Sequence, residues 1–229
     1  MKNKKIVIAG GTGFIGQAMA RYFGKHNHVI ILSRQPVNGR NNKYNRQLIK
    51  AADGYNITYW RWDPFLIEKH WAQELEAADI VINLAGKSVN CRYTEKNKQQ
   101  IINSRTFSTK TIGEAIRATT VPPKLWINAA SATIYRNETT KANDELTGII
   151  SEKKDDNMPY SFFDRLRRSW QKFITGIRYD KSSERYRNID NDFSVNVCRQ
   201  WENTFFDQRT PFTRKIALRT AITLSLIHI

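Results

Sequence analysis

Three glycines near the amino terminus are the residues of this chain best suited to binding an anion. Gly10, Gly13 and Gly16 recur every third residue in IVIAGGTGFIG, between an apolar run and an amphipathic segment. In a strand–turn–helix unit, the first glycine permits the turn, the second lets the backbone approach a pyrophosphate, and the third allows close helix–sheet packing. The helix start then offers free N–H groups and a positive dipole end. The predicted dinucleotide contacts are Gly10, Thr12, Gly13, Phe14, Ile15 and Gly16.

The end of the second predicted strand bears on which dinucleotide the loop accepts. About 20 residues beyond the glycines, an acidic side chain would bind the ribose 2′-hydroxyl group of NAD. This sequence has Ser33 and Arg34 there, and a guanidinium pairs with a 2′-phosphate through charge-assisted hydrogen bonds. The sequence therefore favours NADP(H) over NAD(H). An exposed loop cation, common in so basic a chain, is the alternative interpretation of Arg34.

The elements that must position this loop alternate between strands and helices. Near-continuous apolar runs are typical of parallel strands that are covered on both faces. The predicted strands are residues 4–9, 28–32, 57–62, 80–84, 124–129 and 213–218. The predicted helices are residues 14–24, 65–77 and 93–118, with a short one at 47–52. This alternation predicts an α/β protein.

Charge and cysteine content restrict the class of protein. The chain of 229 residues carries a formal net charge of +16, which attracts polyanions such as nucleic acid, acidic lipid or a phosphate-rich cofactor. Its two cysteines, Cys91 and Cys198, form no paired motif, which argues against a disulfide scaffold and a structural zinc site. No apolar run is long enough to span a bilayer, and residues 1–5 lead into a strand rather than a signal peptide. We therefore expect a cytoplasmic protein without a transmembrane segment.

A charged segment at residues 149–191 differs in composition from its surroundings and is predicted to be an insertion in a domain of residues 1–220. Apolar residues at helical spacing, with arginines and lysines between them, predict a basic amphipathic helix within it. The apolar positions are Phe162, Phe163, Leu166, Trp170, Phe173, Ile174 and Ile177. Such a helix either packs on the parent domain with its basic face in water, or attaches to an anionic surface or a partner.

Several segments carry a resemblance to a known family. They include GGTGFIG at residues 10–16, INLAG at 82–86, SATIY at 131–135 and RKIALRTAITL at 214–224. In these segments the chain resembles the extended branch of the short-chain dehydrogenase/reductase superfamily, and more narrowly its poorly characterised NAD-dependent epimerase/dehydratase-like oxidoreductases. The resemblance implies a Rossmann-type doubly wound parallel sheet, a nicotinamide cofactor, and transfer of a hydride to or from a carbon that bears oxygen.

The same resemblance assigns further residues to the site. Asp63 would lie near the adenine, and Ser131 would hydrogen-bond the substrate. Asn83, Ala85 and Gly86 would border the cofactor. In the polar cluster after LAG, Arg105, together with Arg92, could hold an anionic substrate or the cofactor phosphates. A solvated helix start is the alternative explanation of this cluster.

The acid/base pair usual in this superfamily is missing from the sequence. It is a tyrosine four residues before a lysine, whose cation lowers the pKa of the phenol. Phe193 or Ser194 stands at the tyrosine position here, and Val197 or Cys198 at the lysine position. Either Tyr135 serves as the acid, with Arg105 or Arg199 beside it, or the Cys198 thiol acts, or the protein binds its cofactor without turnover.

The resemblance also concerns the carboxyl-terminal end. Members of the extended branch continue with a substrate-binding lobe, whereas this chain stops at Ile229, so that lobe is expected to be largely missing and residues 221–229 to be a truncated or aberrant end. We predict an NADP(H)-dependent oxidoreductase or epimerase-like protein for a small carbonyl, alcohol or sugar-nucleotide substrate. The alternative is a non-catalytic dinucleotide-binding sensor or scaffold. No nucleic-acid-binding motif occurs, so specific nucleic-acid binding is not expected.

Overall fold

The computed structural model describes residues 1–34, 47–50, 54–136, 142–151 and 181–221. The chain divides into two compact units. One comprises Met1–Ser131 with Arg199–Ile229, and the other comprises Ala132–Cys198. Helix α5 (Lys181–Phe206) contributes to both of them.

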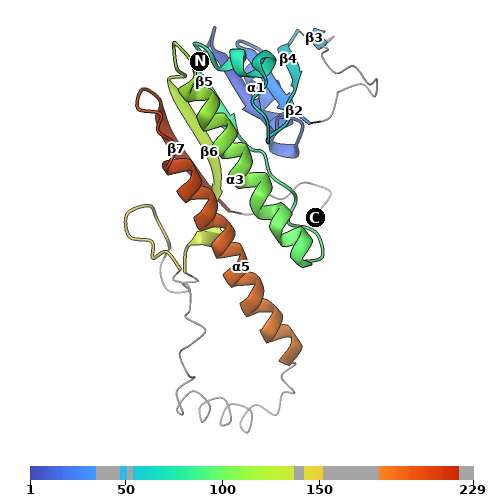
Figure 1. Ribbon diagram of the computed structural model, residues 1–229, viewed down its shortest axis with the longest axis vertical. Helices are drawn as coiled ribbons and strands as arrows, with labels where there is room; N and C mark the ends of the chain where they lie inside the picture. Colours follow the sequence, from blue (N-terminus) through green and yellow to red (C-terminus); the bar gives the residue numbers. More distant parts are fainter. Residues whose placement is uncertain (35–46, 51–53, 137–141, 152–180, 222–229) are drawn as a thin grey trace. The chain divides into compact units, whose positions relative to one another are not determined.

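The first unit is built on a seven-stranded sheet of order β3-β4-β2-β1-β5-β6-β7 (Figure 1). The strands are β1 (Lys5–Ala9), β2 (His28–Ser33), β3 (Gln47–Lys50), β4 (Asn56–Arg61), β5 (Ile80–Asn83), β6 (Leu125–Ser131) and β7 (Arg214–Thr220). Every neighbouring pair of strands is parallel except β3 and β4, which are antiparallel. The strand order reverses at β1, which pairs with β2 on one side and with β5 on the other. The predicted Rossmann-type doubly wound sheet is thus confirmed.

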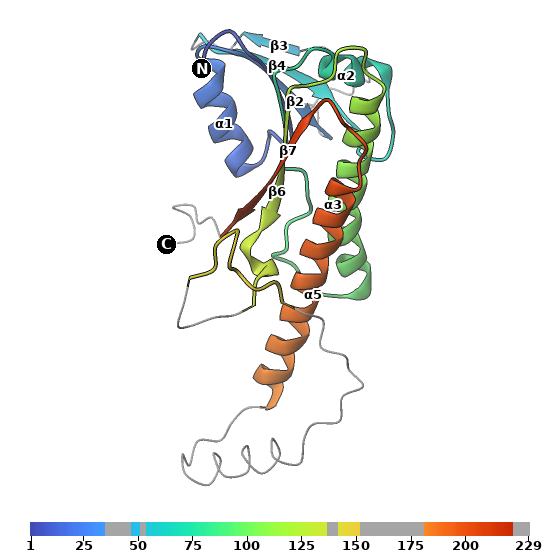
Figure 2. The same ribbon diagram turned by 90° about the vertical axis from the view of Figure 1, so that its left-hand side faces the viewer.

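Helices cover both faces of this sheet (Figure 2). On one face lies α1 (Phe14–Gly24). On the other lie α2 (Lys69–Ala72), the 3₁₀ helix η1 (Gln73–Leu75), α3 (Glu95–Arg117) and the last turns of α5. Within the described part of the chain, no helix is both long enough and apolar enough to cross a membrane.

Two hydrophobic cores follow from the alternation of side chains along the strands. Ile6 and Ile8 of β1 pack with Ala20 of α1 on one face of the sheet. Val7 of β1 packs on the other face, in a cluster that includes Trp126 of β6. Both faces of the central strand are therefore buried, which explains why its sequence is apolar from Ile6 to Ala9.

The second unit is described at its two ends. It begins with the 3₁₀ helix η2 (Ala132–Ile134), and Tyr135 forms an antiparallel bridge with Ile150. The Asp144 carboxylate accepts hydrogen bonds from the backbone N–H groups of Leu146 and Thr147, at 2.8 and 2.6 Å, and closes a turn. The predicted basic helix around residues 162–177 lies outside the described residues.

Two predicted helices differ from the structure. The short helix predicted at residues 47–52 is wrong, because Gln47–Lys50 form β3, which pairs antiparallel with β4. So short a segment is a marginal helix, whereas the edge of β4 offers unpaired backbone groups for a ladder. The helix predicted at residues 65–77 is confined to residues 69–75, since the turn after β4 takes up the beginning of that segment.

The turn between β1 and α1 is too tight for side chains at three glycines. Gly10 has φ +77°, and a β-carbon there would lie 2.9 Å from the backbone nitrogen of Ala85. A β-carbon on Gly11 would lie 2.7 Å from the Ile31 side chain of β2. One on Gly16 would lie 2.6 Å from the α-carbon of Gly11 and 2.7 Å from the carbonyl oxygen of Gly10. The third glycine of the motif thus allows α1 to pack on the turn itself, rather than on the sheet as predicted.

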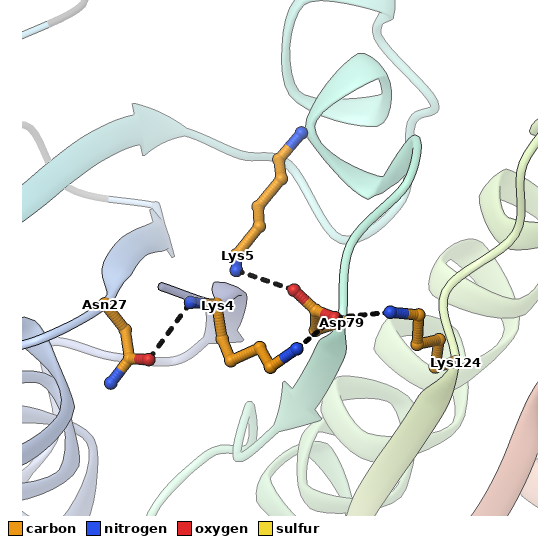
Figure 3. A network of polar contacts seen from close by, with 5 residues as sticks. All are labelled: Lys4, Lys5, Asn27, Asp79 and Lys124. Atoms are coloured by element: carbon orange, nitrogen blue, oxygen red, sulfur yellow. Dashed lines mark hydrogen bonds and ion pairs between the residues drawn. The ribbon is translucent and has the colours of Figure 1, made fainter. Parts of the chain in front are cut away.

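At the amino-terminal ends of the strands, away from the glycine turn, one carboxylate joins three strands (Figure 3). Asp79, directly before β5, accepts hydrogen bonds from the Lys5 backbone N–H at 3.1 Å and from the Lys124 ammonium at 2.8 Å. The Lys4 ammonium lies 3.4 Å from the same carboxylate. The hydrogen bond from Lys124, followed by that from the Lys5 amide, lowers the pKa of Asp79 to about 2. The amino ends of β1, β5 and β6 are therefore tied by one half-buried carboxylate.

The turn predicts a difference between two glycine substitutions. Gly16→Ala should lower the free energy of unfolding by about 2 kcal/mol or more, because its methyl group meets backbone atoms that cannot rotate away. Gly13→Ala should change it by less than about 1 kcal/mol, because its β-carbon would meet only the Gly10 carbonyl oxygen, at 3.4 Å. Urea denaturation of the full chain measures both values. Equal stability of the two variants would contradict this account of the turn.

The Asp79 carboxylate predicts a pH dependence of stability. Its pKa in the folded chain, about 2, is lower than its ordinary value of 3.8. The stabilisation is therefore complete above pH 4 and is lost as the pH falls toward 2. The difference in unfolding free energy between the wild type and Asp79→Asn should shrink by about 1 kcal/mol between pH 6 and pH 3. A difference that stays constant over this range in urea titrations would show that the ion pairs contribute nothing.

Candidate functional site

The predicted site residues of the first unit collect at the carboxyl edge of its sheet. Ser33, Asn83 and Ser131 are the last residues of β2, β5 and β6. The glycine loop follows β1, and Asp63 follows β4 by two residues. Since the strand order reverses at β1, these residues surround the place where open α/β sheets bind their ligands.

The start of α1 presents uncapped backbone N–H groups. Its N-cap is Gly13, which has no side chain, and its first turn contains no acidic residue. The first hydrogen bond of the helix runs from the Gln17 N–H to the Gly13 carbonyl, at 2.9 Å. The N–H groups of Phe14, Ile15 and Gly16 therefore have no acceptor within the helix. Such a helix start attracts an anion.

The space beside Gly13 is open. Its φ of −74° is ordinary, and a β-carbon there would have one neighbour within 4 Å, the Gly10 carbonyl oxygen at 3.4 Å. The protein's own packing therefore does not require glycine at this position, in contrast to Gly10 and Gly16. The Gly13 backbone and its neighbours Thr12 and Phe14 are exposed. The loop thus forms a cradle with open space beside the backbone of Gly13.

The two residues at the end of β2 have different environments. Ser33 is buried, and its hydroxyl oxygen lies 3.2 Å from that of Thr12 in the glycine loop. Arg34 is exposed directly after it. Ser33 thus contacts the glycine loop through a buried hydroxyl group, whereas Arg34 is exposed to solvent.

Asp63 stabilises the turn after β4. Its carboxylate accepts a hydrogen bond from the Phe65 N–H at 3.0 Å, and its carbonyl accepts one from the Leu66 N–H at 3.2 Å. The Thr111 hydroxyl of α3 donates to the next carbonyl in this turn, that of Pro64, at 2.6 Å. The turn that contains Asp63 is therefore held by local hydrogen bonds and by one from α3.

Asn83 holds the loop after β5 from inside the protein. Its side chain is completely buried, and the amide nitrogen donates to Asn128 Oδ1 at 2.7 Å and to Thr109 Oγ1 at 3.1 Å. Its Oδ1 atom accepts from the Ala85 N–H at 3.1 Å. Asn83 therefore sets the path of the LAG segment without exposing any atom of its own.

Sequence reasoning missed the partners of Asn83. Thr109 also accepts from the Trp201 indole N–H at 3.0 Å and donates to Asn128 at 3.3 Å, so its hydroxyl is fully hydrogen-bonded. The sequence contains one signal of this network. The dipeptide Ile-Asn occurs in both β5 and β6, and Asn83 and Asn128 lie opposite each other in the register of the two strands. A polar residue at matching positions of neighbouring buried strands predicts mutual hydrogen bonding.

Arg105 supports the same loop from α3. Its guanidinium donates to the Lys87 and Ile101 carbonyls at 3.1 and 3.0 Å, and it lies 5.2 Å from the centre of a Trp201 ring. A β-carbon on Gly86 would lie 3.3 Å from its Cζ atom. The structure therefore shows Arg105 packed against the LAG loop, with its guanidinium close to Gly86.

The predicted catalytic residues belong to different units. Ser131 is half-buried at the end of β6, opposite Thr220 of β7. Tyr135 belongs to the second unit, where its ring packs so close to Gly148 that a β-carbon there would lie 2.6 Å from its Cε1 atom. On α5, the Cys198 thiol is buried and forms no disulfide bond. Across the described ranges, no three His, Cys, Asp or Glu side chains gather closely enough to hold a metal ion.

Solved structures of similar fold contain nicotinamide dinucleotides. The chain is similar to a human epimerase family protein, SDR39U1, solved with NADPH, with a TM-score of 0.57 and 21% identity over 93% of this chain and 52% of that one. It is also similar to a UDP-glucuronic acid 4-epimerase from Bacillus cereus, solved with UDP-glucuronic acid and NAD. That TM-score is 0.56, with 14% identity over 96% of this chain and 56% of that one. At these identities the likeness shows the fold alone.

Curated relatives and a family profile identify the family. The chain is 36% identical to the epimerase family protein YfhF of Bacillus subtilis over 150 residues, which are 64% of this chain and 44% of that protein. It is 28% identical to an epimerase family protein of Staphylococcus epidermidis over 176 residues, 76% of this chain and 50% of that protein. The chain thus spans about half the length of these relatives. Residues 6–166 match the profile of a single family, so the chain belongs to the NAD dependent epimerase/dehydratase family.

Proposed function

We propose that this chain binds a nicotinamide dinucleotide with its pyrophosphate on the N–H groups of Phe14, Ile15 and Gly16. The observation that carries the proposal is the open cradle at Gly13, at the start of a helix without a side-chain cap. Its position where the strand order reverses supports the same ligand, since the crevice there extends to both sides of β1. Asp63 would lie near the adenine, and Ala85 and Gly86 would border the cofactor on the β5 side.

NADP(H) is the proposed cofactor, because Arg34 is an exposed guanidinium at the end of β2. A 2′-phosphate offers it charge-assisted hydrogen bonds that a ribose diol does not. The similarity to a human protein solved with NADPH supports this choice. The similarity to an epimerase solved with NAD leaves the other dinucleotide as the alternative that the experiment must compare.

The proposed activity is that of an oxidoreductase or epimerase-like protein on a small carbonyl, alcohol or sugar-nucleotide substrate in the cytoplasm. A bound nicotinamide supplies or accepts a hydride. Ser131, at the end of β6, is proposed to hydrogen-bond the substrate oxygen, and Tyr135 to exchange its proton. The membership in an epimerase/dehydratase family supports this class of reaction.

A second candidate function is cofactor binding without turnover, as a sensor or scaffold. It is favoured by the side chains of α5, where Phe193 or Ser194 and Val197 or Cys198 replace the usual tyrosine and lysine. Phenylalanine cannot transfer a proton, and valine cannot lower the pKa of a phenol. Tight NADPH binding without oxidation of NADPH by any of a broad panel of carbonyl compounds would favour this function.

The open space at Gly13 predicts a variant that loses cofactor binding but keeps the stability of the free protein. NADPH in hundredfold excess over its Kd should raise the Tm of the wild-type chain by about 5 °C or more. Gly13→Ala should keep the Tm of the free protein and weaken NADPH binding at least about tenfold, because its methyl group occupies the place of the pyrophosphate. Thermal-shift titration measures both. An unchanged NADPH shift in Gly13→Ala would exclude this loop as the site.

Arg34 predicts a change of cofactor preference. Arg34→Ser should weaken NADPH binding by about 10-fold to 100-fold, the effect of losing charge-assisted hydrogen bonds to phosphate, and should leave NADH binding within about threefold. The comparison requires both dinucleotides to be titrated at one salt concentration, because exposed charges are screened. A wild-type chain that binds NADH more tightly than NADPH would overturn the assignment of Arg34.

A further inference from the structure

Lys87, in the loop after β5, is held by hydrogen bonds of both its backbone and its side chain. Its backbone N–H donates to Ser104 Oγ at 2.8 Å, and its carbonyl accepts from Arg105 Nη1 at 3.1 Å. Its ammonium donates to Asn97 Oδ1 at 2.9 Å and to Gln100 Oε1 at 2.6 Å. All four partners belong to α3, so both ends of this residue are fixed to one rigid element.

The charge of Lys87 is held in place but not neutralised. Both side-chain acceptors are neutral amide oxygens, and among the described residues no carboxylate lies within ion-pair distance of the ammonium. An ammonium group has three N–H donors, and the two amides account for two of them. One donor and the full positive charge are therefore available to a ligand. The charge of Lys98, on α3 itself, differs because the Glu95 carboxylate pairs with its ammonium at 2.9 Å.

The ammonium lies beyond the carboxyl edge of the sheet. Thr109 of α3 is level with Asn83, the last residue of β5, because the two side chains are hydrogen-bonded. Gln100 and Asn97 are two or three helical turns closer to the start of α3, a distance of roughly 14–18 Å along the helix axis. This is the side of the sheet on which a ligand of a doubly wound fold lies. The Lys87 ammonium thus lies beside the amino-terminal turns of α3, beyond the carboxyl end of β5.

We propose that Lys87 binds an anionic oxygen group of the substrate, a phosphate or a carboxylate, and that Asn97 and Gln100 position its ammonium for this purpose. The inference rests on the proposed function, since it names the substrate class of the same site. An ammonium that is positioned before binding loses little side-chain freedom when the anion arrives. A purely structural link between loop and helix would need no charge, because its partners are neutral amides.

The test compares Lys87→Met with Lys98→Met in the full chain, saturated with NADPH. Both variants lose one positive charge beside the amino-terminal part of α3, Lys87 from the loop after β5 and Lys98 from the helix itself, but only the first loses the proposed contact. UDP-glucuronic acid and UDP-glucose are titrated by calorimetry at a fixed salt concentration. Lys87→Met should weaken binding about tenfold or more, whereas Lys98→Met should stay within about twofold of the wild type. Weaker binding of both probes identifies a phosphate contact, and weaker binding of UDP-glucuronic acid alone identifies a carboxylate contact.

Three results would overturn the proposal. They are equal binding by Lys87→Met and the wild type, equal losses in the Lys87 and Lys98 variants, and no binding of either probe by the wild type at millimolar concentration. A lower Tm for Lys87→Met with unchanged affinity would assign Lys87 to the structural link. The NADPH-induced shift in Tm is measured separately on each variant. A wild type without that shift refutes the proposed function, whereas a normal shift with unaltered probe binding refutes the role of Lys87 alone.

Discussion

The turn after β1 is closed by contacts between backbones, and the rest of the candidate site depends on this close approach. The Gly10 carbonyl and the Gly11 α-carbon lie where a β-carbon of residue 16 would be, so α1 begins immediately above the end of its strand. A bulkier turn would move the helix start away from the strand end. The same tight path leaves the Gly13 side of the loop open. One turn therefore has both features: close backbone contacts at Gly10 and Gly16, and open space at Gly13.

The loop after β5 is positioned by buried polar contacts. Asn83 fixes the Ala85 N–H from inside the sheet, and Arg105 fixes the Lys87 carbonyl from α3. Trp201 joins both, since it donates to Thr109 and lies against the Arg105 guanidinium. Because these groups are hydrogen-bonded within the protein, they hold the loop in place. Arg34, directly after β2, is exposed, and Lys87, in the loop after β5, is half-buried.

The sequence predicted the order of the elements well, because apolar periodicity reports burial directly. All six parallel strands and the helices α1 and α3 lie within a few residues of their predicted bounds. It failed at residues 47–52, where the edge of β4 determined the structure and no local pattern indicated it. The sequence also could not predict which way the polar side chains point. Ser33 and Arg105 contact the protein itself, since their partners come from distant positions in the chain. Lys87 was passed over for the same reason, because its amide partners lie 10 and 13 residues away.

The most direct test of the account follows the backbone amides of the cradle during binding. In ¹H–¹⁵N NMR spectra of the full chain, addition of NADPH should shift the Phe14, Ile15 and Gly16 amide protons downfield, because each gains an anionic hydrogen-bond acceptor. Amides at the amino edge of the sheet, such as that of Asp79, should not move. NADPH binding that shifts other resonances and leaves those three unchanged would contradict the central claim that the start of α1 holds the pyrophosphate.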